Sequence, residues 1–498
     1  MAGRADVTPD AAHLEGGRQL TRSWRVVAPA ALVCGIVGCV QPAHYPEPAQ
    51  TDTPTVPASH QLKSAIDMPV VVLHEPEPLS DAPELTEPHS VDDFIRRALA
   101  ENRTVQAAYH NVLSLKERIP QVTALDDPVA SNAVFPIPSV APQYFLMGYN
   151  PYNLTLAQQF PWFGTLRLRG EAAERDVQVA LAELAAAQLD TVAAVKRAYY
   201  NLYAALKTEE ILNENRQILE DFRTIARERL RTGGTQQDVI RSEVLLTELE
   251  REMANNRQGI AMARSALGRQ LHIRPDADLK TLPTLSIAAV PAEIERLNSL
   301  AIAARPELKG RLAAIARDEK AIELARKRFY PNITLGLTYM DMQKTNAEVP
   351  KAASGSPNIG LFVGFNLPVY HNKYRAGVCE AEERALADTK LYESQRDETY
   401  SEIQDLMVQA KVQQNVLDLL RNSILPRTRQ SLELARSDYA KSNVDYATVL
   451  SSLRETVQVQ LQITQVEAEL ARALAALERA VGTQINESPP VQPPADSR

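Results

Sequence analysis

The strongest constraint on the fold is an internal duplication, in which the same landmarks occur twice along the chain and in the same order. Phe160-Pro161 in the first half is matched by Leu367-Pro368 in the second, and Leu267-Gly268-Arg269 is matched by Val481-Gly482-Thr483. Both copies read as a helix, two strands, a long helix, a turn and a final helix. A repeated order of this kind indicates two copies of one structural unit.

Segments of different composition flank the duplication. Arg18, Arg22 and Arg25 precede an uncharged run that ends at Cys39, which has the basic and apolar regions of a signal peptide and is too short to span a bilayer. Pro-rich stretches surround the repeats and cannot bury enough surface to fold. We predict a lipoprotein signal peptide over 1–39, a Pro-rich linker over 40–90, a first repeat over 91–290, a second repeat over 291–482 and a disordered tail over 483–498.

The end of the signal peptide, Ile36-Val37-Gly38-Cys39, resembles a bacterial lipobox, in which the cysteine is acylated and becomes the mature N-terminus. The alternative is a short apolar segment with a chance cysteine. Val40, rather than an aspartate, follows the cysteine, and by the same resemblance this favours export to the outer membrane. We therefore expect lipid on Cys39.

The helices are predicted from long proline-free stretches with apolar residues seven apart. The first long helix should run from about Leu166 to Arg231, which at about 1.5 Å per residue is roughly 100 Å. A seven-residue apolar period predicts coiled-coil packing between neighbouring helices. The other long helix, from about Arg375 to Lys441, contains Pro426 and should kink there. The period is carried by Ile211, Ile218 and Ile225, by Val239, Leu246, Met253, Ile260 and Leu267, and by Val449, Thr456, Ile463, Leu470 and Leu477.

The strands are predicted from windows without charge, between Asp127 and Arg167 and between Lys351 and Lys373, and from the uncharged segment Pro331–Met340. Within them apolar residues alternate with small or polar ones, which indicates strands with one apolar face. A fourth, poorly patterned strand is placed near Gln121–Ala130. The alternating apolar positions are Leu154, Leu156 and Phe160, then Ile333, Leu335, Leu337 and Tyr339, then Ile359, Leu361, Val363, Phe365 and Leu367.

Uncharged strands of this length with one apolar face are typical of a transmembrane β-barrel. A half-buried soluble sheet would show the same alternation, but its wet face usually carries charged residues. Four strands cannot close a barrel, and open edges cannot face lipid. A membrane sheet therefore requires an oligomer, and three copies would supply twelve strands.

Composition excludes several functions. The net charge is −8 without a basic cluster, which argues against nucleic acid as a partner. No paired carboxylates, nucleophile with its base, phosphate-binding glycine loop or metal-ligand spacing can be assembled, so we expect neither an enzyme nor a cofactor or metal site. Met340 and Met342 alternate near a strand end and could contact a soft metal ion, but such pairs are more often packing residues.

Taken with its motifs, this arrangement resembles the TolC-type outer-membrane efflux channel family over about 390 residues. The motifs are Gln159-Phe160-Pro161-Trp162-Phe163-Gly164 at the first strand-to-helix junction, Arg305-Pro306-Glu307-Leu308 at the start of the second repeat, Ile424-Leu425-Pro426, and Gln236-Gln237-Asp238-Val239. The resemblance implies a mainly α chain with a small β part. As a homotrimer it forms a twelve-stranded barrel in outer-membrane lipid, continued by an α-helical periplasmic tunnel.

The resemblance also implies a function. The chain would be the passive exit duct of a tripartite efflux system, fed by an inner-membrane pump through a periplasmic adaptor. The cargo would be metal cations or small toxic compounds such as drugs, because Arg305-Pro306-Glu307-Leu308 resembles the cation and multidrug branches. Alternatives are the outer-membrane component of type I protein secretion, a lipidated periplasmic coiled-coil adaptor, and a soluble enzyme with helical arms. An adaptor should have one helical hairpin between glycine-rich soluble β domains.

In this family the turns of the helical hairpins close the tunnel and dock the adaptor. Here the turns are Thr232-Gly233-Gly234 and Ser442-Asn443-Val444. The resemblance places Asp238 at the tunnel mouth, although an aspartate at a helix start is equally explained by the helix dipole. The second hairpin departs from the family pattern, because the equivalent position is Thr448 and the nearest carboxylate, the other candidate for the mouth, is Asp445. Trp162, Phe163 and Tyr370 stand where strands meet helices and would either form an interfacial aromatic belt or pack the junction.

Overall fold

In a computed structural model of the chain, the residues described are 87–134, 152–231, 233–274, 277–341, 357–441 and 444–485. The signal peptide, the lipobox cysteine and the C-terminal tail beyond residue 485 lie outside these ranges, as do Thr232, Ser442, Asn443 and Met342.

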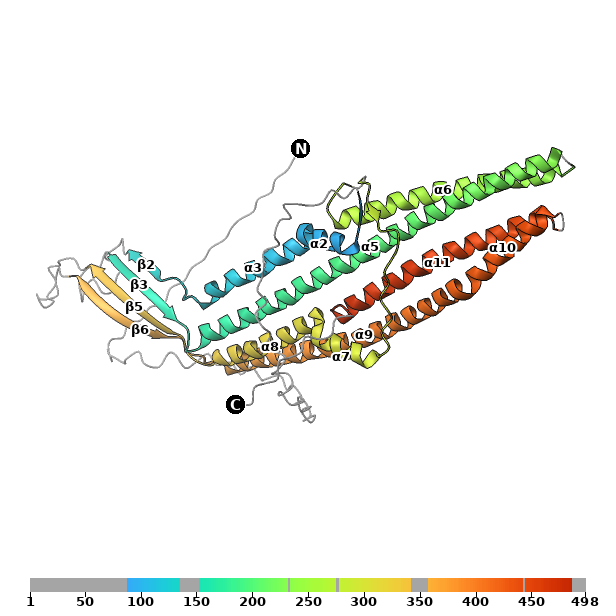
Figure 1. The fold of residues 1–498 in the computed structure, drawn as a ribbon. Coiled ribbons are helices and arrows are strands. Elements are labelled where there is room, and N and C mark those ends of the chain that lie inside the picture. Colours follow the sequence, from blue (N-terminus) through green and yellow to red (C-terminus); the bar gives the residue numbers. More distant parts are fainter. Residues whose placement is uncertain are drawn as a thin grey trace, which may run out of the picture. The chain divides into compact units, whose positions relative to one another are not determined.

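Two successions of elements with the same order make up the described chain (Figure 1). Short strands β1 and β4 form a separate parallel pair. The bounds of the first half are β1 Pro88–His89, α2 Val91–Glu101, α3 Arg103–Thr123, β2 Val129–Val134, β3 Tyr152–Phe160, α5 Thr165–Arg231, α6 Gln236–Gln270 and β4 Lys280–Thr281. Those of the second half are α7 Ile294–Ala304, α8 Pro306–Lys327, β5 Ile333–Asp341, β6 Asn358–Phe365, α9 His371–Leu419, the π-helical turn η2 Leu420–Ile424, α10 Leu425–Ala440 and α11 Tyr446–Val481.

Each half starts with two helices separated by a single extended residue. Asn102 and Arg305 occupy these breaks, with backbone φ/ψ of −67°/119° and −61°/120°. Asn102 caps α3 through Oδ1, which accepts hydrogen bonds from the amides of Thr104 at 2.9 Å and Val105 at 3.3 Å. Pro306 instead begins α8, where the missing amide proton is not needed. The first two helices of each half are therefore separated in the same way, by an asparagine cap in one half and by a proline at the helix start in the other.

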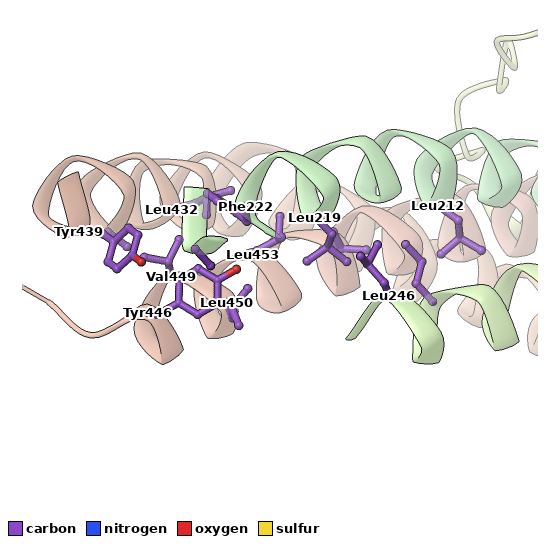
Figure 2. Packing of buried hydrophobic residues seen from close by; sticks show 14 of the residues in the cluster. Leu212, Leu219, Phe222, Leu246, Leu432, Tyr439, Tyr446, Val449, Leu450 and Leu453 are labelled. Carbon is purple, nitrogen blue, oxygen red and sulfur yellow. The ribbon is translucent and has the colours of Figure 1, made fainter. Parts of the chain in front are cut away.

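The predicted coiled-coil seams are confirmed in both final helices. All ten seven-spaced residues of α6 and α11 are buried. In α5 the predicted line is confirmed at Ile211, which is buried, and is lost by Ile225, which is exposed. The neighbouring line of Leu212, Leu219 and Ala226 stays buried throughout. A straight α-helix drifts by about 20° per seven residues, which carries the isoleucine line out of the contact. The apolar cluster in Figure 2 joins residues of α5, α6, α10 and α11.

The predicted interruption at Pro426 takes the form of a π-helical turn. The helix from His371 continues to Leu419, and the next five residues widen into a π turn in which the Leu425 amide donates to the carbonyl of Leu420. A proline ring clashes with the carbonyl four residues before it, and the wider turn gives the ring room. In the first half α5 runs through its 67 residues as a single α-helix.

The strands form one antiparallel sheet in the order β2-β3-β5-β6. Its register places Leu156 opposite Leu337, and Leu337 opposite Leu361, on one face. The other face, called the small polar face, carries mostly small or polar residues, with Thr155 and Thr338 hydroxyls 3.4 Å apart, although Phe362 opposite Gly336 and Val129 of β2 also lie on it. The predicted alternation therefore extends over neighbouring strands and gives the sheet one apolar face.

The strand predicted near Gln121–Ala130 was misplaced. Helix α3 continues through Pro120 to Thr123, and β2 occupies Val129–Val134. Packing holds the last turn of this helix: a Cβ on Gly170 of α5 would lie 2.7 Å from Cγ2 of Thr123, so only glycine permits this approach. The proline therefore lies inside the helix and does not end it.

Candidate functional site

The sheet has two features that a folded soluble domain would normally cover. Its apolar face is exposed in the single chain: Leu361 is 85% accessible and Ile359 is 68% accessible. Among the described strands, β2 and β6 each have a neighbour on one side only. Unpaired edges and a large apolar face together indicate a surface that another molecule or lipid covers.

Aromatic residues gather where the strands meet the helices. Trp162 stacks on Tyr330 with ring centroids 5.2 Å apart and planes 13° apart, so it packs the junction. Phe163 and Tyr370 point to solvent instead, 76% and 73% accessible. Trp162 therefore packs the junction, whereas Phe163 and Tyr370 remain candidates for an interfacial aromatic belt.

At the opposite end of the long helices, the turn after α5 is a tight glycine cap. Gly233 has a φ of +111°, and the amide of Gly234 donates to the carbonyl of Arg229 at 2.8 Å. This is the Schellman arrangement, in which a left-handed residue ends the helix. No atom lies within 4 Å of a Cβ built on Gly233, so the constraint on this residue is its backbone conformation.

Two contacts near the turns fasten the helical hairpins to each other. Arg229 of α5 donates a 2.5 Å hydrogen bond to the carbonyl of Tyr439 in α10, and its guanidinium lies 3.8 Å from the centroid of the tyrosine ring. Ser242 of α6 and the buried hydroxyl of Tyr446 at the start of α11 are 2.7 Å apart. Figure 2 shows both tyrosines at the end of the apolar cluster. Burial raises the pKa of Tyr439 and of Tyr446, so both hydroxyls are protonated at neutral pH.

The two predicted mouth aspartates differ in position. Asp238 is half-buried in the first turn of α6, and its backbone carbonyl accepts from the Ser242 hydroxyl at 2.8 Å. Asp445 is exposed at the start of α11, where its carboxylate lies 3.9 Å from Arg241. Both therefore stand at helix starts beside the turns, a position that suits the helix dipole as well as a charged mouth.

The Arg305-Pro306-Glu307-Leu308 motif lies away from both ends and has a structural role. Arg305, only 7% accessible, contacts the Glu402 carboxylate at 2.8 Å and the Ala480 carbonyl at 3.2 Å. Glu307 forms an ion pair with Arg479, which also bonds to Asp190 at 2.6 Å. Burial opposes ionisation of Glu307, but the hydrogen bond and charge of Arg479 outweigh it and lower its pKa. The network joins α5, α8, α9 and α11. The motif was recognised in the sequence, but its role in holding these helices together was not.

The described residues contain no group of three or more His, Cys, Asp or Glu placed to hold a metal ion. Met340 lies on the small polar face of the sheet, opposite Asn153 and Asn358. Cys379 is an exposed free thiol on α9.

Residues 297–483 match the family model described as outer membrane efflux protein. The fusaric acid resistance protein FusA of Burkholderia cepacia is 28% identical over 191 residues, which are 37% of this chain and 36% of that protein. The match thus spans about a third of this relative.

Solved structures match over more of the chain. The outer-membrane channel OprN superposes with a TM-score of 0.65 at 20% identity, covering 82% of this chain and 94% of that one. The outer membrane protein VceC of Vibrio cholerae gives 0.64 at 18% identity, covering 79% and 96%. Residues 297–483 are therefore similar to the outer membrane efflux protein family, and the described chain has the fold of outer-membrane channels such as OprN.

Proposed function

We propose that this chain is the outer-membrane exit channel of a tripartite efflux system. The observation that carries the proposal is the four-stranded sheet, which has one exposed apolar face and no strand partner at its outer edges among the described residues. Neither lipid nor water satisfies both features in a single chain, because open edges require hydrogen-bond partners and the apolar face requires an apolar environment. A closed barrel embedded in the outer membrane meets both requirements.

Three copies would close the sheet into a barrel. In a homotrimer β2 of one copy pairs with β6 of the next, and four strands per chain become a twelve-stranded barrel. The apolar face, with Leu337 and Leu361, then contacts lipid, while the small polar face lines the interior. The helical hairpins continue the interior as a periplasmic tunnel, and the two repeats over 91–290 and 291–482 supply equivalent walls.

The turns at the far end suit closure and docking. Arg229 with Tyr439, and Ser242 with Tyr446, hold the hairpins of one copy together. We assign the periplasmic adaptor to the turns around Gly233-Gly234 and 442–444, and the inner-membrane pump acts behind it. The cargo is small toxic compounds or metal cations. The similarity to FusA, a fusaric acid resistance protein, favours small organic compounds over exported proteins.

Cysteine pairs on the sheet edges test the trimer. With Asn132→Cys fixed in β2, cysteine is placed in turn at Ile359, Leu361 and Val363 of β6, on the same face, in a Cys379→Ser background. Because a disulfide needs Cα atoms within about 7 Å, at least one position should give covalent dimers and trimers on a non-reducing gel. Gly360→Cys, on the opposite face, is the control. Cross-links only within single chains would contradict the trimer.

A lipid on Cys39 would add anchoring to the barrel. We expect labelling with a palmitate analogue to mark the wild-type chain and to be lost in Cys39→Ser. Equal labelling of both chains would remove the lipoprotein assignment, and it would leave the barrel proposal unaffected.

Three copies of Asp238 around an axis would make an anionic ring at the tunnel mouth. Asp238→Ala should therefore lower the cation preference of single channels, measured as a smaller reversal potential in a salt gradient. Asp221→Ala, in α5 away from the turn, is the matched control. Unchanged selectivity together with a lowered melting temperature would assign Asp238 to the helix dipole alone.

A further inference from the structure

A cavity of about 290 Å³ lies where the sheet meets the helices. The cations and asparagines of the lining come from four segments: Arg169 from α5, Lys327 and Arg328 at the end of α8, Asn332 just before β5 and Asn366 just after β6. Because the lining comes from separated parts of the sequence, the cavity is a product of the fold and left no local motif to detect.

The lining contains three cations and no carboxylate. Among the described residues, no ion pair involves Arg169, Lys327 or Arg328. Their neighbours are different: Arg167 pairs with Glu171 at 2.8 Å, and Arg326 pairs with Glu382 at 3.0 Å. Glu171 and Glu382 are thus paired with cations outside the lining, and the lining itself, with three cations and no carboxylate, carries an excess positive charge.

The cavity lies on the polar side of the sheet. Thr334 and Gly364 are paired on the small polar face, and Asn332 and Asn366 continue that face one step beyond the ladder. The Asn332 amide donates to Oδ1 of Asn366, which keeps the two residues together. If this face lines the barrel interior, as the proposed function requires, the cavity opens into the duct where the barrel becomes the tunnel.

We infer that this basic cavity is a binding station for small organic anions in transit, molecules that carry a carboxylate or phosphate group; the inference rests on the proposed function and names its substrate class. An arginine guanidinium matches the two oxygens of such a group, and a lysine ammonium adds a point charge. The asparagine side chains supply neutral donors. The open site favours rapid release, as a passive duct requires.

The test compares two variants with the same loss of charge on the same helices. Arg169→Gln/Lys327→Gln removes two cations of the cavity, and Arg167→Gln/Arg326→Gln removes two that pair with carboxylates outside it. Citrate binding to the purified detergent-solubilised protein is measured by calorimetry, and citrate block is measured on single channels in planar bilayers. The cavity variant should bind citrate at least about tenfold more weakly and lose the block, whereas the control should keep both.

Lys327→Arg keeps the charge and should retain binding, which separates loss of the site from loss of folding. If both double variants bind citrate equally well, the inference is overturned. Normal conductance in the same experiment would still support the proposed channel. A third outcome is that citrate binding is lost only in the cavity variant but the wild-type protein forms no channel. That result would support the anion site and overturn the transit role. Co-purified anionic phospholipid that disappears only in the cavity variant also overturns the transit role, because the cavity would then hold a lipid headgroup.

Discussion

Arginine in place of Leu361 is expected to abolish assembly of the proposed trimer. This side chain is 85% accessible in the single chain and lies on the apolar face of β6. In the proposed barrel it faces hydrocarbon, where an arginine near the midplane costs about 2–4 kcal/mol per chain. Because the trimer carries three copies, the penalty is incurred three times in the assembled channel. Trimer yield is read on a semi-native gel, with and without heating.

Gly360→Arg is the matched control, on the adjacent residue of the same strand. A Cβ built on Gly360 has no heavy atom within 4 Å, and its side chain would point to the opposite, polar face. We expect this variant to assemble, with a changed conductance because the new charge lies in the duct. Equal trimer loss in the two variants would contradict the assigned facing of the sheet.

Arg305→Met should cause the largest loss of stability in the helical part. The arginine is 7% accessible and joins the start of α8 to Glu402 of α9 and to the end of α11. Removing one partner of a buried ion pair costs about 3–5 kcal/mol, and we expect the lower end because Glu402 is partly exposed and regains water. Thermal unfolding followed by circular dichroism measures the loss. Arg326→Met, on the exposed pair with Glu382, should change the melting temperature little.

The same network predicts how stability depends on pH. The pKa of Glu307 is lowered in the folded chain, so its contribution is fully present above the unfolded value of about 4.5 and disappears as the pH falls through the folded value. Acid should therefore destabilise the wild type over this range more than Glu307→Gln, which has no carboxyl to protonate. If the melting temperatures of the wild type and Glu307→Gln fall in parallel as the pH is lowered, the ion pair with Arg479 contributes nothing to stability.

Much of this fold could be predicted from the sequence because its signals are long and repetitive. The helix from Leu166 was placed within one residue of its observed start, and the seams of α6 and α11 follow the seven-residue period. The strand alternation also gave the apolar face correctly. These features depend on local patterns, which survive without knowledge of tertiary contacts.

Tertiary contacts explain the failures. The strand expected near Gln121–Ala130 was misplaced, because packing of Thr123 against Gly170 holds α3 through Pro120 and β2 begins only at Val129. The basic cavity escaped detection because Arg169 and Lys327 are far apart in sequence and only the fold brings them to one lining. The role of Arg305 was likewise invisible, since its partners lie on α9 and α11.

The unpaired strands β2 and β6 also have a consequence for how the cell must handle this protein. Before assembly each copy exposes two strand edges with unpaired backbone N–H and C=O groups, next to an apolar surface. This combination favours aggregation with other extended chains. Assembly of the proposed trimer would consume three copies, so its yield would fall steeply at low protein concentration, whereas one unproductive encounter would remove a copy. On the proposed function, newly exported copies would therefore need a periplasmic escort that covers these edges until partners arrive.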